Sequence, residues 1–143
     1  MTTTTYNSLR EKIAAESAAR RTRDAQFANL WIQANDEARF RVAGIAVKPM
    51  IVVGNNHATG EQERYFVEDG VCGFAYIKIA PATHTFARWL KKRGIGHRSY
   101  YGGWEISIRE YGQSMQRKEE HARVVAELLV ENGVPATHYS RMD

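Results

Sequence analysis

The chain has 143 residues, of which 43% are hydrophobic and 25% charged, and its formal net charge is +4. This length allows one domain with a modest core, and no apolar run approaches the roughly 20 residues of a membrane-spanning helix. A single cysteine, Cys72, excludes an internal disulfide framework and favours a reducing, cytoplasmic compartment; we expect no secretory signal.

Residues 6–40 predict one long helix, because they contain no Gly or Pro and are rich in strong helix formers. The apolar positions are uneven: Leu9 and Ile13 mark one short stripe, and a better stripe begins at Phe27. A helix with so thin a stripe needs a packing partner. We therefore expect a helical arm, residues 1–44, that lies across the domain or joins a second copy in a homo-oligomer through residues 6–40.

Residues 45–143 predict an α+β domain with the element order β-β-β-α-β-α-β. The first two strand segments, IAVKPMIVVG and ERYFVEDG, flank the polar stretch NNHATGEQ and indicate a hairpin with a long tip. The third segment, VCGFAYIKI, follows the turn signal EDG. The predicted fold class is therefore α+β: a long N-terminal helix, then a mostly antiparallel sheet with two helices packed on one face.

The two helices of this domain have recognisable ends. Thr83 or Thr85 can cap the first, PATHTFARWLKKRG, and Gly94 can end it. Alternation in the next strand, GWEISIREY, places Trp104 on the inner face and its charged residues on the outer face. Ser114 can cap the second helix, which ends before Pro135 and a last extended stretch.

The net positive charge is concentrated in one segment. Residues 70–104 contain six Lys or Arg and no carboxylate, whereas residues 1–69 are balanced and residues 105–143 carry a net −2. The same basic segment holds seven aromatic residues. Cations interleaved with aromatics suit phosphates and stacked bases. The alternative is a solvated helix face beside ordinary core aromatics.

Next to this segment, Gly102 and Gly103 permit positive φ angles and the close approach of a ligand. The helix that starts near Ser114 offers free N–H groups and a partial positive charge to an anion. In the alternative interpretation, Ser114 is only a cap, and Arg117 and Lys118 pair with acidic neighbours, Glu120 and Glu119. The predicted ligand-binding residues, for a nucleic acid or nucleotide, are Arg88, Lys92, Arg98, Tyr100, Tyr101, Gly102, Gly103, Arg109, Gln113, Ser114, Arg117 and Lys118.

The histidines point to no metal site. Five are scattered along the chain, and no pair has the spacing of a zinc site, so we expect no metal and no cofactor. Two of them lie in H-x-[S/T] patterns, His57-Ala-Thr59 and His138-Tyr-Ser140, which resemble the paired signature of 2H phosphoesterases. This resemblance implies a phosphodiesterase in which His57 and His138 act as general acid and base in one cleft.

A further resemblance covers residues 69–143. The segments CGFAYI, FARWLKK, YYGGWEI, QSMQRK and SRMD are similar to a pattern of small bacteriophage and mobile-element proteins, CGFAxI…FxxWLKK…YxGGxxI…QSxxRK…SRMD. The resemblance implies an accessory protein of the host cytoplasm that binds nucleic acid, a nucleotide signal or a host protein. Our leading hypothesis is a non-enzymatic module that binds a phosphate-bearing ligand. The alternative is a protein-interaction module, either a host-factor inhibitor or a virion component.

Overall fold

The computed structural model describes residues 2–67 and 69–143; Met1 and Glu68, which fall within the predicted arm and domain, lie outside the described residues. The chain divides into two compact units, residues 1–33 and 34–143. Helix α1 (Thr2–Ala43) contributes to both units, because its residues 34–43 belong to the second. The sequence instead predicts the boundary between the helical arm and the α+β domain after residue 44.

The described residues of the first unit, 2–33, are helical, as the absence of Gly and Pro predicts. Leu9 and Ile13 are 55% and 54% exposed in it. Exposed apolar residues on a helix leave room for a packing partner, and the homo-oligomer through residues 6–40 stays a prediction. None of the helices among the described residues is long and apolar enough to cross a membrane.

In the second unit, α1 ends in a stripe of small buried residues. Ala34, Ala38 and Val42 are 1%, 0% and 4% exposed, and their spacing of four places them on one side of the helix. Small side chains allow the helix backbone to lie close to its neighbours.

Strands β1 (Met50–Asn55) and β2 (Gln62–Val67) form an antiparallel hairpin in which Asn55 pairs with Gln62. The Asn56 N–H donates to the Glu61 carbonyl at 2.7 Å and closes the tip. The predicted hairpin is thus confirmed, but it makes a separate two-stranded sheet and does not extend the main one.

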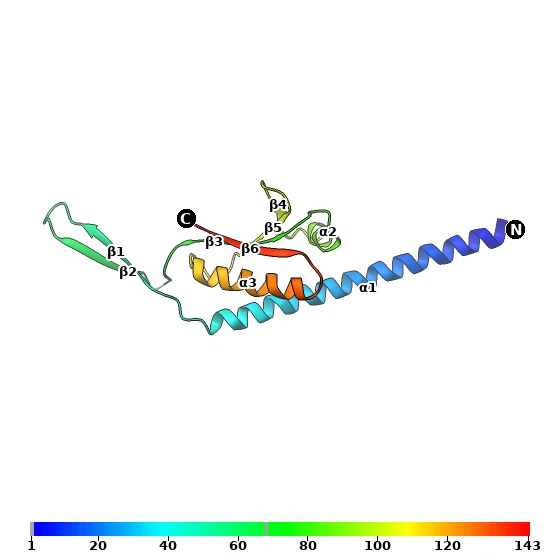
Figure 1. Cartoon of the computed structure of the whole chain (residues 1–143), viewed down its shortest axis with the longest axis horizontal. Helices are drawn as coiled ribbons and strands as arrows, with labels where there is room; N and C mark the ends of the chain where they lie inside the picture. The colour runs from blue at the N-terminus through cyan, green and yellow to red at the C-terminus, as the bar shows by residue number, and fades with distance from the viewer. Residues whose placement is uncertain (1, 68) are drawn as a thin grey trace. The chain divides into compact units, whose positions relative to one another are not determined.

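The main sheet has four strands in the order β4-β5-β3-β6, and every neighbouring pair is antiparallel. Helix α2 (Thr85–Lys92) connects β3 to β4, and α3 (Met115–Glu131) connects β5 to β6. This βαββαβ order is the split βαβ arrangement of ferredoxin-like folds. The α+β fold class is confirmed (Figure 1). The four strands are β3 (Gly73–Ile79), β4 (His97–Arg98), β5 (Trp104–Ser107) and β6 (Ala136–Met142).

The core lies between this sheet and the helices. Burial alternates along β3: Ile77 and Ile79 are fully buried on the side of α3, and the residues between them are half-buried. Helix α2 adds Phe86 and Leu90, both 0% exposed. Trp104 is buried as predicted, and its indole N–H donates to the carbonyl of Ile95 at 2.8 Å.

The ends of the helices agree with those predicted from the sequence, except at the N-cap of α2. His84, not Thr83 or Thr85, caps α2, because its Nδ1 accepts a hydrogen bond from the Phe86 N–H at 3.1 Å. Gly94 follows the helix with a φ of +71°, as the predicted stop requires. A histidine ring nitrogen can replace a hydroxyl oxygen as an acceptor, which the preference for Ser, Thr, Asp and Asn at caps does not reveal.

Two details of the β4–β5 region differ from the prediction. The sequence indicates one strand between the helices, whereas β4 adds a two-residue strand too short to show alternation. Glu105, predicted to face outward into solvent, is only 7% exposed. Its carboxylate is tolerated there because it accepts a hydrogen bond from the Tyr139 hydroxyl and lies 3.2 Å from His97 Nε2.

Candidate functional site

The basic residues of α2 and β4 form one pocket. Helix α2 presents Arg88, Lys91 and Lys92 at positions i, i+3 and i+4, which share one side of a helix. Arg98 points to the helix side of the sheet, since its register partner Trp104 is an inward-facing residue. The pocket is an open depression of about 510 Å³, which we call the basic pocket, and its lining residues are Ala82, Thr83, Arg88, Lys91, Lys92 and Arg98.

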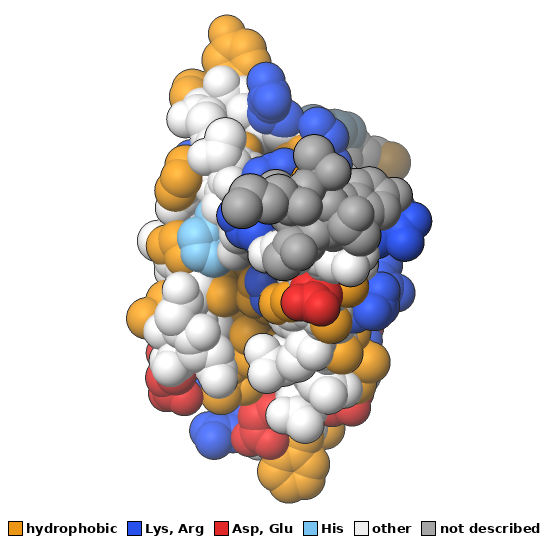
Figure 2. All heavy atoms as spheres, turned by 90° about the vertical axis from the view of Figure 1, so that its right-hand side faces the viewer, with side chains coloured by type: hydrophobic (Ala, Val, Ile, Leu, Met, Phe, Trp, Pro, Cys, Tyr) orange, Lys and Arg blue, Asp and Glu red, His pale blue; other side chains and the backbone are white. Residues whose placement is uncertain are grey.

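The basic pocket carries uncompensated positive charge. No carboxylate lines it, and in the part of the chain that the structure describes no side-chain hydrogen bond or ion pair engages its four cations. All four side chains are exposed, so they can turn toward a ligand. Four neighbouring positive charges repel one another, and a bound anion would reduce this repulsion. Figure 2 shows one face of the molecule, on which Lys and Arg, Asp and Glu, and hydrophobic side chains are interspersed.

Two tyrosines follow Arg98 in the turn between β4 and β5. Tyr100 and Tyr101 are 93% and 87% exposed, and their rings meet edge to face with centroids 5.1 Å apart. The turn that carries them is ordered by Ser99, whose N–H donates to the Gly103 carbonyl at 3.0 Å. The rings therefore keep faces free for stacking on an aromatic ligand.

The glycines of this turn have different roles. Gly102 and Gly103 both adopt positive φ, +95° and +82°. A Cβ on Gly103 would lie 2.9 Å from Lys78 Cε and 3.0 Å from the Ile79 carbonyl, whereas a Cβ on Gly102 would meet nothing within 4 Å. The close approach that the sequence assigns to a ligand is, at Gly103, an approach of the chain to β3.

The N-terminus of α3 is occupied by groups of the chain itself. Ser114 is fully buried, and its hydroxyl accepts a hydrogen bond from the Arg117 N–H at 3.4 Å, which confirms the predicted cap. Arg117 forms an ion pair with Asp69 at 2.7 Å, whereas the predicted alternative partner, Glu120, binds Arg123. A carboxylate thus already neutralises Arg117.

Lys118 is also engaged within the fold. It is 6% exposed, its Nζ donates to the Gly73 carbonyl at 3.2 Å, and it lies 5.5 Å from the ring centroid of Phe74. Arg109 and Gln113 are exposed, in the segment between β5 and α3. The structure therefore brings Arg88, Lys92 and Arg98 together in the basic pocket, whereas Ser114, Arg117 and Lys118 stabilise the start of α3.

The two histidines of the phosphoesterase hypothesis belong to separate elements: one lies in the loop of the β1–β2 hairpin, and the other on the main sheet. His57 is exposed at the tip of the β1–β2 hairpin, and His138 lies on β6 of the main sheet. No pairing joins these sheets among the described strands, so this arrangement gives the predicted shared cleft no support. Among the described residues, no group of three or more His, Cys, Asp or Glu could hold a metal ion.

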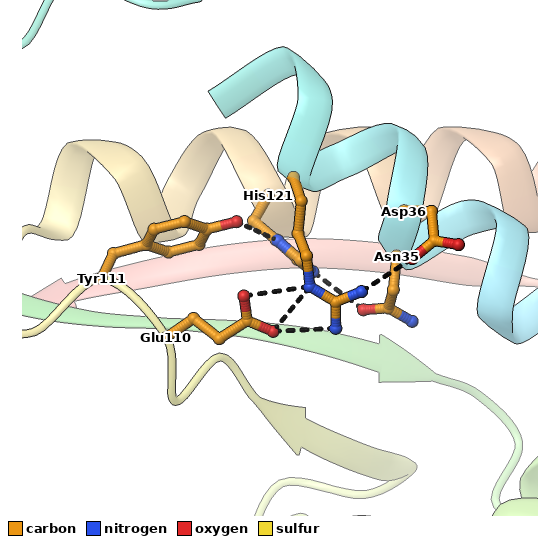
Figure 3. Close-up of polar contacts among 6 residues, drawn as sticks. Asn35, Asp36, Glu110, Tyr111 and His121 are labelled. Carbon is orange, nitrogen blue, oxygen red and sulfur yellow. Dashed lines mark hydrogen bonds and ion pairs between the residues drawn. The ribbon is translucent and has the colours of Figure 1, made fainter. Parts of the chain in front are cut away.

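A polar network around the buried His121 connects the end of α1 to α3 and to the segment after β5 (Figure 3). His121 is 1% exposed; its Nδ1 lies 2.7 Å from the Tyr111 hydroxyl and its Nε2 lies 2.8 Å from Asn35 Oδ1. Beside it, Arg39 binds both carboxylate oxygens of Glu110 at 2.9–3.1 Å. Because the amide oxygen can only accept, Nε2 carries the proton and Nδ1 accepts from Tyr111, so a neutral His121 satisfies every partner.

Burial lowers the pKa of His121 below its ordinary value near 6.5, and nearby Arg39 lowers it further, although Glu110 acts in the opposite direction. The unfolded chain therefore binds this proton at a higher pH than the folded protein does. We expect the free energy of unfolding to be undiminished above pH 6.5 and to fall as the pH drops below it, by at most about 1.4 kcal/mol per pH unit. Urea denaturation between pH 5 and pH 8 measures this slope.

The matched control is His121→Gln, which fills the site with a side chain that does not titrate. The other four histidines are the same in both proteins, so the difference between the two slopes isolates His121. Equal slopes for the two proteins would contradict the expectation.

Sequence reasoning missed two features of these sites. Lys91 is a lining residue of the basic pocket, and its spacing of three from Arg88 is the signal that identifies it. The contact of His121 with Asn35 has no local signal, because 86 positions separate the two residues.

The chain has no significant match among protein-family models, curated proteins or solved structures.

Proposed function

We propose that the protein is a non-enzymatic module that binds a phosphate-bearing ligand, a nucleic acid or a nucleotide, at the basic pocket. The observation that supports this most is the gathering of Arg88, Lys91, Lys92 and Arg98 around one depression that no carboxylate lines. Lys and Arg neutralise phosphate charge and supply most of the affinity in such complexes.

The chemistry of the neighbouring turn favours a ligand that also carries bases. Tyr100 and Tyr101 are almost fully exposed and follow Arg98 after one residue, Ser99. An aromatic ring stacks on any base, while the cations hold the adjoining phosphates. An accessory role in a phage or mobile element, which the pattern in residues 69–143 implies, is part of this proposal.

The test is binding of labelled single-stranded and duplex oligonucleotides, followed by fluorescence anisotropy, with a cyclic dinucleotide as competitor. We expect affinity that falls steeply as salt rises, since bound phosphates release counterions. The double charge reversal Lys92→Glu/Arg98→Glu should weaken binding by roughly tenfold or more. Both positions are exposed, so stability should change by less than about 0.5 kcal/mol for each.

The matched control is Lys12→Glu/Arg20→Glu on the first unit, which changes the net charge by the same amount at exposed positions. An effect of net charge alone would weaken binding equally in both double variants. Equal losses, or full affinity after Lys92→Glu/Arg98→Glu, would contradict binding at the basic pocket.

A further inference from the structure

One face of the main sheet carries aromatic and cationic side chains. Helix α3 packs against β3 and β6, and the inward residues of β3 are buried on that side. The alternate residues Phe74, Tyr76 and Lys78 point to the opposite side and remain partly exposed, although the Lys118 ammonium of α3 reaches to 5.5 Å from the Phe74 ring centroid. We call this side the open sheet face.

The strand register brings further residues onto the open sheet face, since cross-strand partners point to the same side. Tyr76 pairs with Tyr139 of β6, and Phe74 pairs with Arg141. The two tyrosine rings stack, with centroids 4.9 Å apart and planes inclined by 25°. The Arg141 guanidinium lies 5.5 Å from the Phe74 ring centroid, and its Nη2 donates to the Tyr76 hydroxyl at 3.4 Å.

The position of Tyr139 is fixed by the buried carboxylate of Glu105, which accepts the hydrogen bond of its hydroxyl. Burial and this hydrogen bond raise the pKa of Tyr139, so the hydroxyl stays protonated and keeps donating. Glu105 itself pairs with Lys78 in the strand register and lies near His97. The Glu105 carboxylate on this face therefore already has partners within the chain, the Tyr139 hydroxyl and His97.

These contacts define the chemistry that the open sheet face can recognise. Its rings offer flat apolar surfaces on β3 and on the edge strand β6, and Lys78 and Arg141 add positive charge next to them. Bases present free π-faces only when they are unpaired and unstacked. In a duplex both faces of each inner base are already covered, so the complementary ligand is a single strand whose phosphates meet the cations.

We infer that the open sheet face binds single-stranded nucleic acid by stacking bases on Phe74 and on the Tyr76–Tyr139 pair. This inference rests on the proposed function, that the protein binds a phosphate-bearing ligand. The basic pocket lies on the helix side of the sheet, so a strand that reaches both sites would pass around the edge strand β4. The inference adds strandedness to that proposal: the ligand is a single-stranded polymer, and duplexes and free nucleotides bind less tightly. RNA and DNA share the chemistry that this face recognises.

The experiment measures anisotropy of labelled strands of about 12 nucleotides, within the site sizes of small single-strand-binding domains. The probes are a single-stranded RNA, a single-stranded DNA, the corresponding duplex and an abasic strand with the same phosphates. We expect the full-length protein to bind a base-containing single strand at least about tenfold more tightly than the abasic strand or the duplex. Comparison of the first two probes identifies the sugar that is preferred.

Two substitutions test whether the rings on the open sheet face are responsible for the binding of bases. Tyr76→Leu and Phe74→Leu keep an apolar side chain and remove one stacking ring each, at positions that are only half-buried. Each should reduce affinity for the base-containing strand by roughly fivefold to a hundredfold and leave abasic binding unchanged. The abasic comparison uses the unaltered protein, so the inference remains testable if a variant does not fold.

The outcomes separate this inference from the proposed function. If no probe binds, the proposed function and this inference both fail. If abasic, duplex and base-containing strands bind equally and Tyr76→Leu has no effect, the basic pocket binds phosphate and the inference about the sheet is overturned. Tight binding of single strands that depends on Tyr76 and Phe74 supports both.

Discussion

Replacement of Phe86 by Ala should lower the free energy of unfolding by about 3–5 kcal/mol. Phe86 is fully buried, and its ring centroid lies 5.6 Å from that of Trp89. Truncation to Ala removes the buried ring and leaves a cavity that close-packed neighbours fill only in part. Denaturation in urea, followed by circular dichroism, measures the change. The effect is large because α2 has only eight residues and depends on its buried side for stability.

Arg88→Ala on the same helix is the matched control. Arg88 is exposed, so this substitution should change the free energy of unfolding by less than about 0.5 kcal/mol while it weakens ligand binding. Phe86→Ala should instead lower the stability of the helix that carries three of the four pocket cations. If the two variants were equally stable, Phe86 would not anchor α2, and the basic pocket would not depend on this part of the core.

Local patterns predict much of the fold. The continuous helix of α1, the hairpin, the Ser114 cap and the glycine after α2 each follow from residues that lie close together in the sequence. The order of strands in the main sheet does not follow from such patterns. It requires pairing between β3 and β6, which are far apart in the chain, and a two-residue strand, β4, that has no periodicity.

The candidate site, like the fold, is only partly predictable from local sequence patterns. Helical spacing and the absence of carboxylates in residues 70–104 locate the cations of α2, which the fold then joins to Arg98. Lys118 has the same charge, yet it is buried against the Gly73 carbonyl. Composition cannot distinguish these cases, because burial depends on which strand lies opposite the helix. The open sheet face likewise becomes visible only once the register places Tyr139 beside Tyr76.

Substitution of Gly96 by Ala should cost about 2–5 kcal/mol, the second large effect that the structure predicts. Gly96 precedes β4 with a φ of +84°, a conformation that costs an L-residue energy. A Cβ would also lie 2.6 Å from the Glu105 carbonyl oxygen and 2.6 Å from Trp104 Nε1. The carbonyl belongs to a paired strand and the indole donates to Ile95, so neither group can move without loss of a hydrogen bond.

Gly94→Ala provides a control that separates strain from crowding. Gly94 has a similar φ of +71°, but a Cβ there would meet nothing within 4 Å. It should therefore incur only the conformational cost of about 1–2 kcal/mol, and the excess for Gly96→Ala measures the contact with Trp104. Thermal denaturation gives both values, and indole fluorescence reports displacement of the tryptophan. Equal losses would show that the β4–β5 turn adapts freely around Trp104, in which case its packing would not fix the position of Arg98 at the basic pocket.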